Sequence, residues 1–231
     1  MEKNKNKNVE IICRNQLISV IIPARNEENY IEQTLKSIKT QSYKNIEIIV
    51  VCNNCKDKTH AIASKYTNKV YDTTLPNVSL NRNYGVRNAE GEIFVFLDAD
   101  CIADKFLIEK IVYWTRKGYI GGTVKTSPLE NKFKHKLIWR LGHITKYIFL
   151  TASGIMFCKA GYFPKFRTDL NVAEDTYFIL GLKKQGKVKY ITDSFIKTSM
   201  RRFEKEGYLK TLFKQVFAFF RRKKIAYKEV R

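Results

Sequence analysis

The sequence predicts an α/β fold: a single Rossmann-like sheet with helices on both faces. Two observations predict it. Short β-branched apolar runs alternate with segments of helical spacing through the first hundred residues, and polar loops follow the apolar runs. The chain has 231 residues, 44% of them hydrophobic, which is enough for one large core. Ligands of such sheets bind at the carboxyl ends of the strands.

The first strand is expected at 17–22, where a β-branched run stops at Pro23. Asn26 is expected to cap the helix that follows. Glu27 and Glu28 would then lie in its first turn, where the helix dipole favours acidic side chains. Apolar residues at helical spacing continue this helix: Ile31, Leu35 and Ile38.

The alternation continues along the chain. A second strand is expected at 46–51, with a polar loop at 52–57 and helical sequence from Thr59. A short strand at 70–71 and a helix at 81–89 come next.

A further buried strand, expected at 93–97, runs directly into Asp98-Ala99-Asp100. Two carboxylates two residues apart can hold Mg²⁺ or Mn²⁺, while a diphosphate supplies further oxygen ligands. A divalent cation would stabilise the charge that develops on a leaving diphosphate. Aspartates after a strand are equally common as turn formers, so the motif alone leaves both readings open.

A second acidic pair, Glu174-Asp175, lies downstream. A carboxylate here could accept the proton of an attacking hydroxyl. The alternative is a pair at a helix N-terminus, placed there by the helix dipole alone.

The ends of the chain are basic. Residues 1–14 are expected to form a tail, 15–203 the main domain and 204–231 a C-terminal amphipathic helix. Apolar side chains recur there at helical spacing, followed by four basic residues at 221–224. The apolar positions are Leu209, Leu212, Phe213, Val216, Phe217 and Phe220.

The charge balance favours an anionic partner. Lys and Arg outnumber Asp and Glu by 43 to 22, which gives a formal charge of +21. Such a field attracts nucleic acid, an anionic membrane or phosphorylated substrates. No window reaches the roughly 18–20 apolar residues of a membrane span, and residues 1–8 lack the apolar core of a signal peptide. The sequence therefore predicts a cytoplasmic protein.

The five cysteines form no disulfide framework. Cys52-x-x-Cys55 suggests zinc or redox chemistry, but there is no second pair of this spacing and the three histidines show no ligand spacing. We therefore expect small residues packed in a loop.

Taken in order, the motifs resemble family 2 glycosyltransferases. The resemblance runs from about residue 17 to residue 202. It rests on the following stretches: Ser19-Val20-Ile21-Ile22-Pro23-Ala24-Arg25-Asn26-Glu27-Glu28, Asp57 and Thr59, Arg82-Asn83-x-Gly85, Gly91-Glu92, Asp98-Ala99-Asp100, Gly121-Gly122-Thr123, Gly154 and Glu174-Asp175.

The resemblance implies a GT-A fold, a nucleotide-sugar donor, a Mn²⁺ or Mg²⁺ cofactor and inversion at the anomeric carbon. It divides the domain into a nucleotide-sugar half, 15–125, and an acceptor half, 126–203. By position, Asp175 would be the general base, with Glu174 beside it. Asp100 would bind the metal, and Asp98 would contact both the metal and the sugar side of the donor. Further substrate-binding residues would be Pro23, Ala24, Asn26, Glu27, Asn53, Arg82, Arg201 and Arg202.

Two departures from the family pattern affect specificity. Cys52-Asn53-Asn54 stands where an aspartate usually meets the base, so UDP- and GDP-sugars both stay open. The Gln-x-x-Arg-Trp motif of processive synthases is missing, which favours addition of a single sugar.

The C-terminal amphipathic helix could dock on the main domain, which is the commonest fate of such a helix. Its basic run favours an anionic membrane surface instead, and with it a peripheral location on the inner face and a lipid-linked or membrane glycan acceptor. Two other classes stay open: a sugar nucleotidyltransferase and a non-enzymatic polyanion-binding protein. Nucleic acid is not expected as a partner, because no nucleic-acid-binding motif stands out.

Overall fold

The computed structural model describes residues 16–130, 154–170 and 173–207, the side chains of 202, 203 and 206 excepted. The strands are β1 (Ile18–Ala24), β2 (Ile46–Asn53), β3 (Val70–Thr73), β4 (Ile93–Leu97), β5 (Cys101–Ala103), β6 (Gly121–Pro128), β7 (Ile155–Lys159) and β8 (Val188–Thr198). The helices are α2 (Ile31–Lys39), α3 (Thr59–Ala63), α4 (Val78–Arg87), α5 (Leu107–Arg116), α7 (Glu174–Lys183) and α8 (Arg201–Glu206), with a 3₁₀ turn at Ala160–Tyr162.

All eight strands form one sheet in the order β3-β2-β1-β4-β7-β6-β8-β5. The first four neighbours in this order, β3 to β4, are parallel. In the register of the central strand β1, Ile18 lies opposite both Ile46 and Ile93. The ends of β1, β2 and β4 therefore meet at one edge of the sheet, as the sequence predicts.

The other side of the sheet is mixed. Strand β7 runs antiparallel to both β4 and β6, β8 is parallel to β6, and β5 pairs antiparallel with β8. The antiparallel strand β7 carries the chain back beside β4, so residues far apart in sequence reach the same edge as Asp98.

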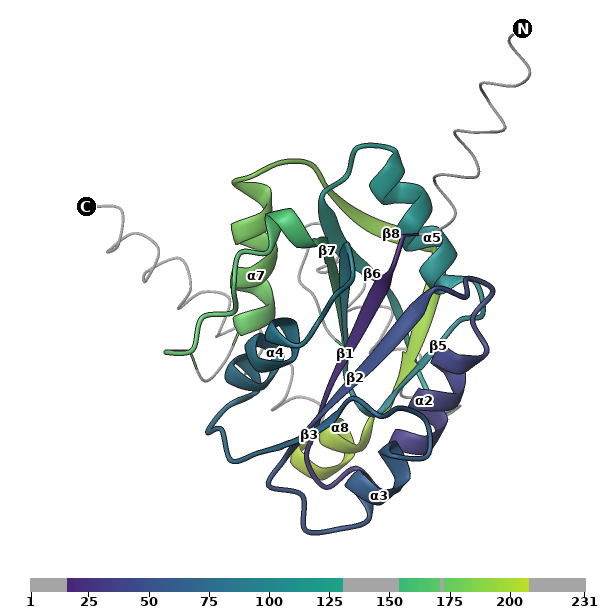
Figure 1. Ribbon diagram of the computed structural model, residues 1–231, viewed down its shortest axis with the longest axis vertical. Coiled ribbons are helices and arrows are strands. Elements are labelled where there is room, and N and C mark those ends of the chain that lie inside the picture. The colour runs from purple at the N-terminus through teal and green to yellow at the C-terminus, as the bar shows by residue number, and fades with distance from the viewer. Residues whose placement is uncertain (1–15, 131–153, 171–172, 208–231) are drawn as a thin grey trace, which may run out of the picture.

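Helices cover both faces of the sheet, which confirms the predicted fold class. Figure 1 shows α4 and α7 on one side of β1 and β2, with α2, α3 and α5 on the other. The sheet has a hydrophobic core on each face. Alternate residues of each buried strand point into one core or the other, because successive side chains of a strand point to opposite faces. In β1, Ile22 packs on the α2 side and Ile21 on the α4 side.

Two expected helix starts are wrong. Helix α2 begins at Ile31, and Asn26 does not cap it. Asn26 instead has a left-handed backbone (φ 54°), which turns the chain, and its Oδ1 accepts the amide hydrogen of Lys56 at 2.9 Å. Helix α4 begins at Val78, earlier than expected, because the side chain of Asn77 caps it.

The expected division of the chain cuts through elements of the sheet. Residue 125 lies within β6, so the two proposed halves share one sheet, and residue 204 lies within α8. The predicted tail at 1–14 and the amphipathic positions 209–220 lie outside the described residues. Among the described helices, none is long and apolar enough to span a membrane.

Candidate active site

Two loops that leave the carboxyl ends of β1 and β2 are bonded to each other. The amide of Glu27 donates to Thr59 Oγ1 at 2.7 Å, and the amide of Glu28 donates to Asp57 Oδ2 at 3.1 Å. Asp57 also accepts hydrogen bonds from the amide and the hydroxyl of Thr59. Burial opposes its charge, but these donors outweigh burial and lower the pKa of Asp57. The loops therefore form a fixed rim, which we call the donor rim (residues 23–30 and 53–59).

The donor rim contains residues expected to meet the nucleotide. Pro23 and Ala24 are the last two residues of β1, and Asn53 is the last residue of β2. Asn26 is exposed and ties the two loops together through its bond to Lys56. The structure thus brings these residues to one edge of the sheet.

A buried arginine joins the two halves of the chain. The side chain of Arg82, on α4, is 5% exposed and donates to Asp98 Oδ1 at 2.9 Å and to Glu174 Oε1 at 3.0 Å. Burial disfavours its charge, yet the two carboxylates outweigh burial and raise the pKa of Arg82. Its guanidinium carbon also lies 5.2 Å from the ring centre of Phe166. Arg82 therefore positions Asp98 and Glu174, residues that are 76 positions apart.

Asp98 and Asp100 follow β4 directly, as predicted. The amide of Asp98 donates to the carbonyl of Gly154 at 2.9 Å, and Gly154 has a φ of +76°, a conformation that favours glycine. The Asp98 side chain is 38% exposed and the Asp100 side chain 17%. Burial, reinforced by repulsion from Asp98 and Glu27, raises the pKa of Asp100 to about 6 despite attraction by Arg201.

Arg201, at the start of α8, reaches back to the donor rim. Its Nη2 donates to Glu27 Oε1 and lies 3.4 Å from Asp100 Oδ2. Its guanidinium carbon lies 4.7 Å from the ring centre of Tyr30. The second oxygen of Glu27, Oε2, is buried and has no hydrogen-bond partner. Arg201 is thus a cation placed between two carboxylates that still have unused oxygen lone pairs.

The acidic pair Glu174-Asp175 begins α7. The preceding residue, Ala173, has a left-handed backbone (φ 63°), a conformation that costs a non-glycine residue about 1–3 kcal/mol. Both residues lie in the first turn of the helix, as the alternative interpretation predicts, and Asp175 Oδ1 accepts the amide hydrogen of Thr176 at 2.6 Å. Burial and the neighbouring Glu174 nonetheless raise the pKa of Asp175 to about 7, against the opposing effect of Arg82.

Six of the predicted site residues thus form two contact groups, which adjoin where the chain runs from Asp98 to Asp100. Contacts run from Glu174 through Arg82 to Asp98, and from Asp100 through Arg201 to Glu27. Arg202 lies in α8, but its side chain is outside the described residues. Sequence reasoning missed two aromatic neighbours, Tyr30 and Phe166, because an isolated aromatic residue carries no signal of the arginine that it contacts.

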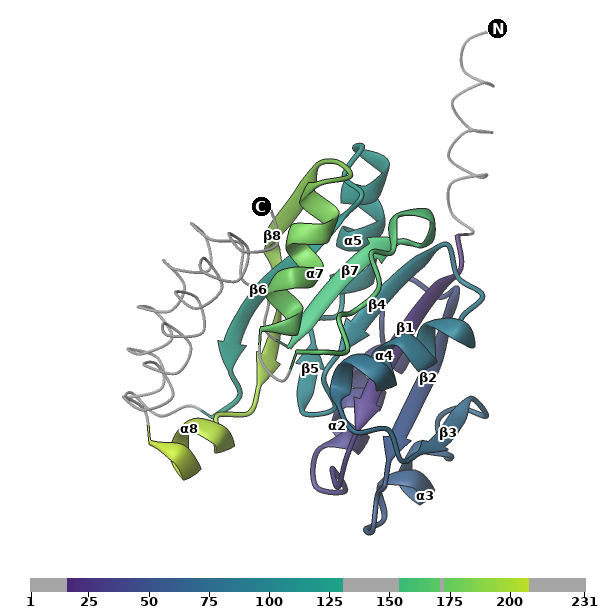
Figure 2. The ribbon, with the colours of Figure 1, turned by 90° about the vertical axis from the view of Figure 1, so that its left-hand side faces the viewer.

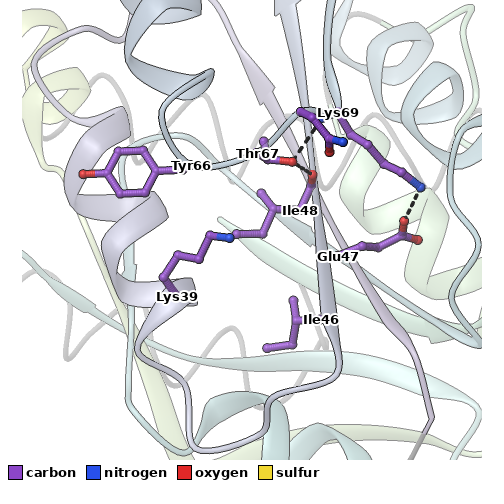
Figure 3. A pocket seen from close by; sticks show the side chains of 8 residues that line it. Lys39, Ile46, Glu47, Ile48, Tyr66, Thr67 and Lys69 are labelled. Atoms are coloured by element: carbon purple, nitrogen blue, oxygen red, sulfur yellow. Dashed lines mark hydrogen bonds and ion pairs between the residues drawn. The ribbon is translucent and has the colours of Figure 1, made fainter.

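A shallow hollow elsewhere on the surface is separate from these groups. Figure 3 shows its lining side chains, which come from α2, the start of β2 and the segment before β3. It lies near Ile46, at the opposite end of β2 from Asn53. Its Lys69 is paired with Glu47 and Glu90, and Lys39 is the other basic residue of its lining.

Comparison with known proteins identifies a family. Residues 19–171 match the model of glycosyl transferase family 2. An uncharacterized glycosyltransferase of Rickettsia typhi is 43% identical over 86 residues, which cover 36% of this chain and 27% of that protein. Glycosyltransferase GlyA of Streptococcus pneumoniae is 34% identical over 125 residues, 50% of this chain and 18% of that protein. The chain therefore spans about a quarter or less of these two relatives.

Solved structures share the fold. S. aureus TarS (residues 1–349) superposes with a TM-score of 0.65 at 20% identity, covering 81% of this chain and 62% of that one. The mannosyltransferase PcManGT of Pyrobaculum calidifontis, solved with GDP-Man and Mn²⁺, gives a TM-score of 0.62 at 20% identity, covering 77% and 55%. At this identity the likeness establishes the GT-A type of fold.

Proposed function

Because the chain belongs to glycosyl transferase family 2, we propose that it moves one sugar from a nucleotide-diphosphate sugar to an acceptor hydroxyl, with inversion. The observation that carries this proposal is the connected acidic group at the carboxyl edge of the sheet. Asp98 and Glu174 meet on one buried guanidinium, and Asp100 and Asp175 stand next to them in sequence. A donor site and an acceptor base are thereby held together by Arg82.

A divalent cation, Mn²⁺ or Mg²⁺, fits the residues beside Asp98. The raised pKa of Asp100 and the unpartnered oxygen of Glu27 reflect crowded negative charge that a cation would relieve. Asp100 would hold the ion, with Asp98 beside it. When bound, such an ion would stabilise the developing charge of the leaving diphosphate. Two structural neighbours were solved with Mn²⁺.

Asp175 is the proposed general base. As the acceptor oxygen forms its bond to the anomeric carbon, the bond from that carbon to the diphosphate breaks, and the hydroxyl proton passes to the carboxylate of Asp175. A pKa near 7 suits this role, since the ideal base titrates near the working pH. Glu174 is the less suitable base because Arg82 already binds one of its oxygens.

The donor rim is the proposed nucleotide site. Pro23, Ala24, Asn26 and Asn53 would surround the base and ribose. Arg201, and with it Arg202, would meet the diphosphate, because a guanidinium can bind phosphate through two parallel hydrogen bonds. TarS has been solved with UDP-GlcNAc and the mannosyltransferase with GDP-Man, so both bases are candidates here.

A thermal-shift panel tests the activity class. UDP- and GDP-sugars with Mn²⁺ should raise the melting temperature, at saturating ligand, by more than either nucleotide sugar without metal. Oligonucleotides should not. A sugar nucleotidyltransferase would instead release pyrophosphate from a nucleoside triphosphate and a sugar phosphate, and detection of that product would refute the proposal.

The acceptor is proposed to be a lipid-linked or membrane glycan at an anionic membrane surface. The sequence of 204–231 supports this, with its apolar positions followed by a basic run. One relative, 35% identical over 102 residues, is the minor teichoic acid biosynthesis protein GgaB of Bacillus subtilis. With this acceptor, we propose a peripheral location on the inner face of the membrane.

Liposome sedimentation tests the membrane proposal. The full chain should sediment with anionic liposomes, less so at high salt, and should lose this binding when it is cut after Gly207. The truncated chain should keep nucleotide binding, since no proposed contact lies beyond Arg202. A full chain that ignores liposomes would refute the membrane surface while leaving the transferase proposal in place.

A further inference from the structure

Three potential metal ligands from different elements converge beneath the donor rim. They are Cys52 of β2, His60 of α3 and Asp72 of β3, and their ligand atoms all lie within 4.8 Å of one another. His60 Nδ1 is 2.9 Å from the Asp72 carboxylate. Cys52 is fully buried, whereas His60 and Asp72 reach the surface.

The topology explains this convergence. Cys52 and Asp72 are direct register partners in the parallel pair of β2 and β3, so their side chains share one face of the sheet. Helix α3 packs on that face, where Cys52 and Ala63 belong to one core cluster. His60, in the first turn of α3, is thereby brought to the end of the two strands.

Cys55 lies near this group, in the loop between β2 and α3, but it is not one of the three mutually close ligands. Its thiol donates to the carbonyl of Ala24 at 3.5 Å. The sulfur of Cys52, the imidazole of His60 and the carboxylate of Asp72 are all ligand types that Zn²⁺ accepts, and a water molecule can take the fourth position of its tetrahedron.

We propose that Cys52, His60 and Asp72 bind a zinc ion. This site differs in kind from the one beside Asp98 and Asp100, because thiolate and imidazole select soft cations, whereas carboxylates alone suit Mg²⁺ or Mn²⁺. The ion would tie the loop after β2 to β3 and so fix the part of the donor rim that carries Asn53 and Asp57. The inference does not depend on the proposed transfer reaction.

Cobalt absorption tests the site on the full chain. After removal of metals with a chelator, Co²⁺ is added in the presence of excess Mg²⁺, which fills oxygen-donor sites. One equivalent should produce the intense tetrahedral bands and the thiolate charge-transfer band, and Zn²⁺ should abolish both. Binding should release a proton and weaken below neutral pH, because the thiol of Cys52 must ionise and His60 must be neutral.

Variants locate the ion. Cys52→Ser should lose the thiolate band, and His60→Gln, at a partly exposed position, should weaken Co²⁺ binding at least tenfold. Cys101→Ser is the matched control, because Cys101 is a buried thiol beside Asp100, and the band should persist in it. If Cys52→Ser does not fold, His60→Gln decides the question.

Three results would overturn the proposal: a wild-type chain without a charge-transfer band, a band that Cys101→Ser removes, or unchanged Co²⁺ affinity in His60→Gln.

Discussion

Two aspartates at the same edge of the sheet are in opposite electrostatic situations. Asp57, on the donor rim, accepts hydrogen bonds from two backbone amides and one hydroxyl, which lower its pKa against the effect of burial. Asp100, after β4, is buried beside Asp98 and Glu27, and its pKa is raised to about 6. The charge of Asp57 is therefore balanced by hydrogen bonds within the donor rim, whereas the negative charge around Asp100 is offset only in part by Arg201.

The same contrast separates the roles of the two regions. A carboxylate whose hydrogen bonds are satisfied by its own fold contributes stability and position. Carboxylates held close together at a cost in free energy are typical of sites that bind a cation or move a proton. On this account, substitution of Asp57 should affect stability, whereas substitutions of Asp100 and Asp175 should affect binding and turnover.

The largest effect is expected for Asp175→Asn. The amide keeps the size of the side chain but accepts no proton, so turnover should fall about 10²–10⁴-fold while donor affinity is retained. In the wild type, turnover should rise as pH increases through about 7, because the base acts in its ionised form. Wild-type turnover in the variant would move the base to Glu174 or Asp169.

Arg82→Met should be the most destabilising change. It leaves Asp98 and Glu174 partly buried without their shared cation, and loss of one partner from a buried pair costs about 3–5 kcal/mol. Urea unfolding measures the change. Arg87→Met, an exposed arginine on the same helix, is the control and should change the free energy of unfolding by less than about 0.5 kcal/mol. Equal effects would mean that the Arg82 contacts add nothing.

Asp100→Asn should stabilise the metal-free protein at neutral pH. A carboxyl whose folded pKa is raised weakens the fold as pH rises from about 4 through about 6, because the folded state then holds the proton more tightly than the unfolded state. At about 1.4 kcal/mol per pKa unit, and allowing for partial exposure, the gain is about 1–3 kcal/mol. The gain should vanish below pH 4, and a loss of stability at pH 7 would contradict the account.

Asp57→Ala should have a smaller effect of the opposite sign. The amides of Glu28 and Thr59 lose their acceptor, at a cost of about 1–2 kcal/mol, because water replaces part of the bonding at this exposed rim. Its stability deficit should be fully present above about pH 4 and should shrink as pH falls below 4, because the wild-type carboxyl has a lowered pKa in the folded state. A variant as stable as the wild type would show that the rim is not held by Asp57.

The sequence predicts most of the parallel half of the fold because β1, β2 and β4 are largely apolar. Strand β4 and the aspartates after it follow from local pattern alone. The start of α2 does not, since the left-handed turn at Asn26 depends on a hydrogen bond to Lys56 in another loop.

Contacts between residues far apart in the sequence are the part of the site that local sequence patterns do not predict. Arg82 meets Glu174 across 92 residues, and Arg201 meets Glu27 across 174. Both depend on β7 and β8 returning the chain to the first half of the sheet; Figure 2 shows α8 directly beyond the end of β8. The meeting of Cys52 with Asp72 likewise follows from strand register, which no spacing along the chain reveals.

The most direct test of the central claim is calorimetric titration of the full chain with UDP and GDP, each with and without Mn²⁺. The account predicts that Mn²⁺ tightens binding of the preferred nucleotide in the wild type and in Asp57→Asn. It predicts that Asp100→Asn binds the nucleotide equally with and without the metal. The same Mn²⁺-dependent gain in Asp100→Asn as in the wild type would contradict the claim that Asp100 holds the cation.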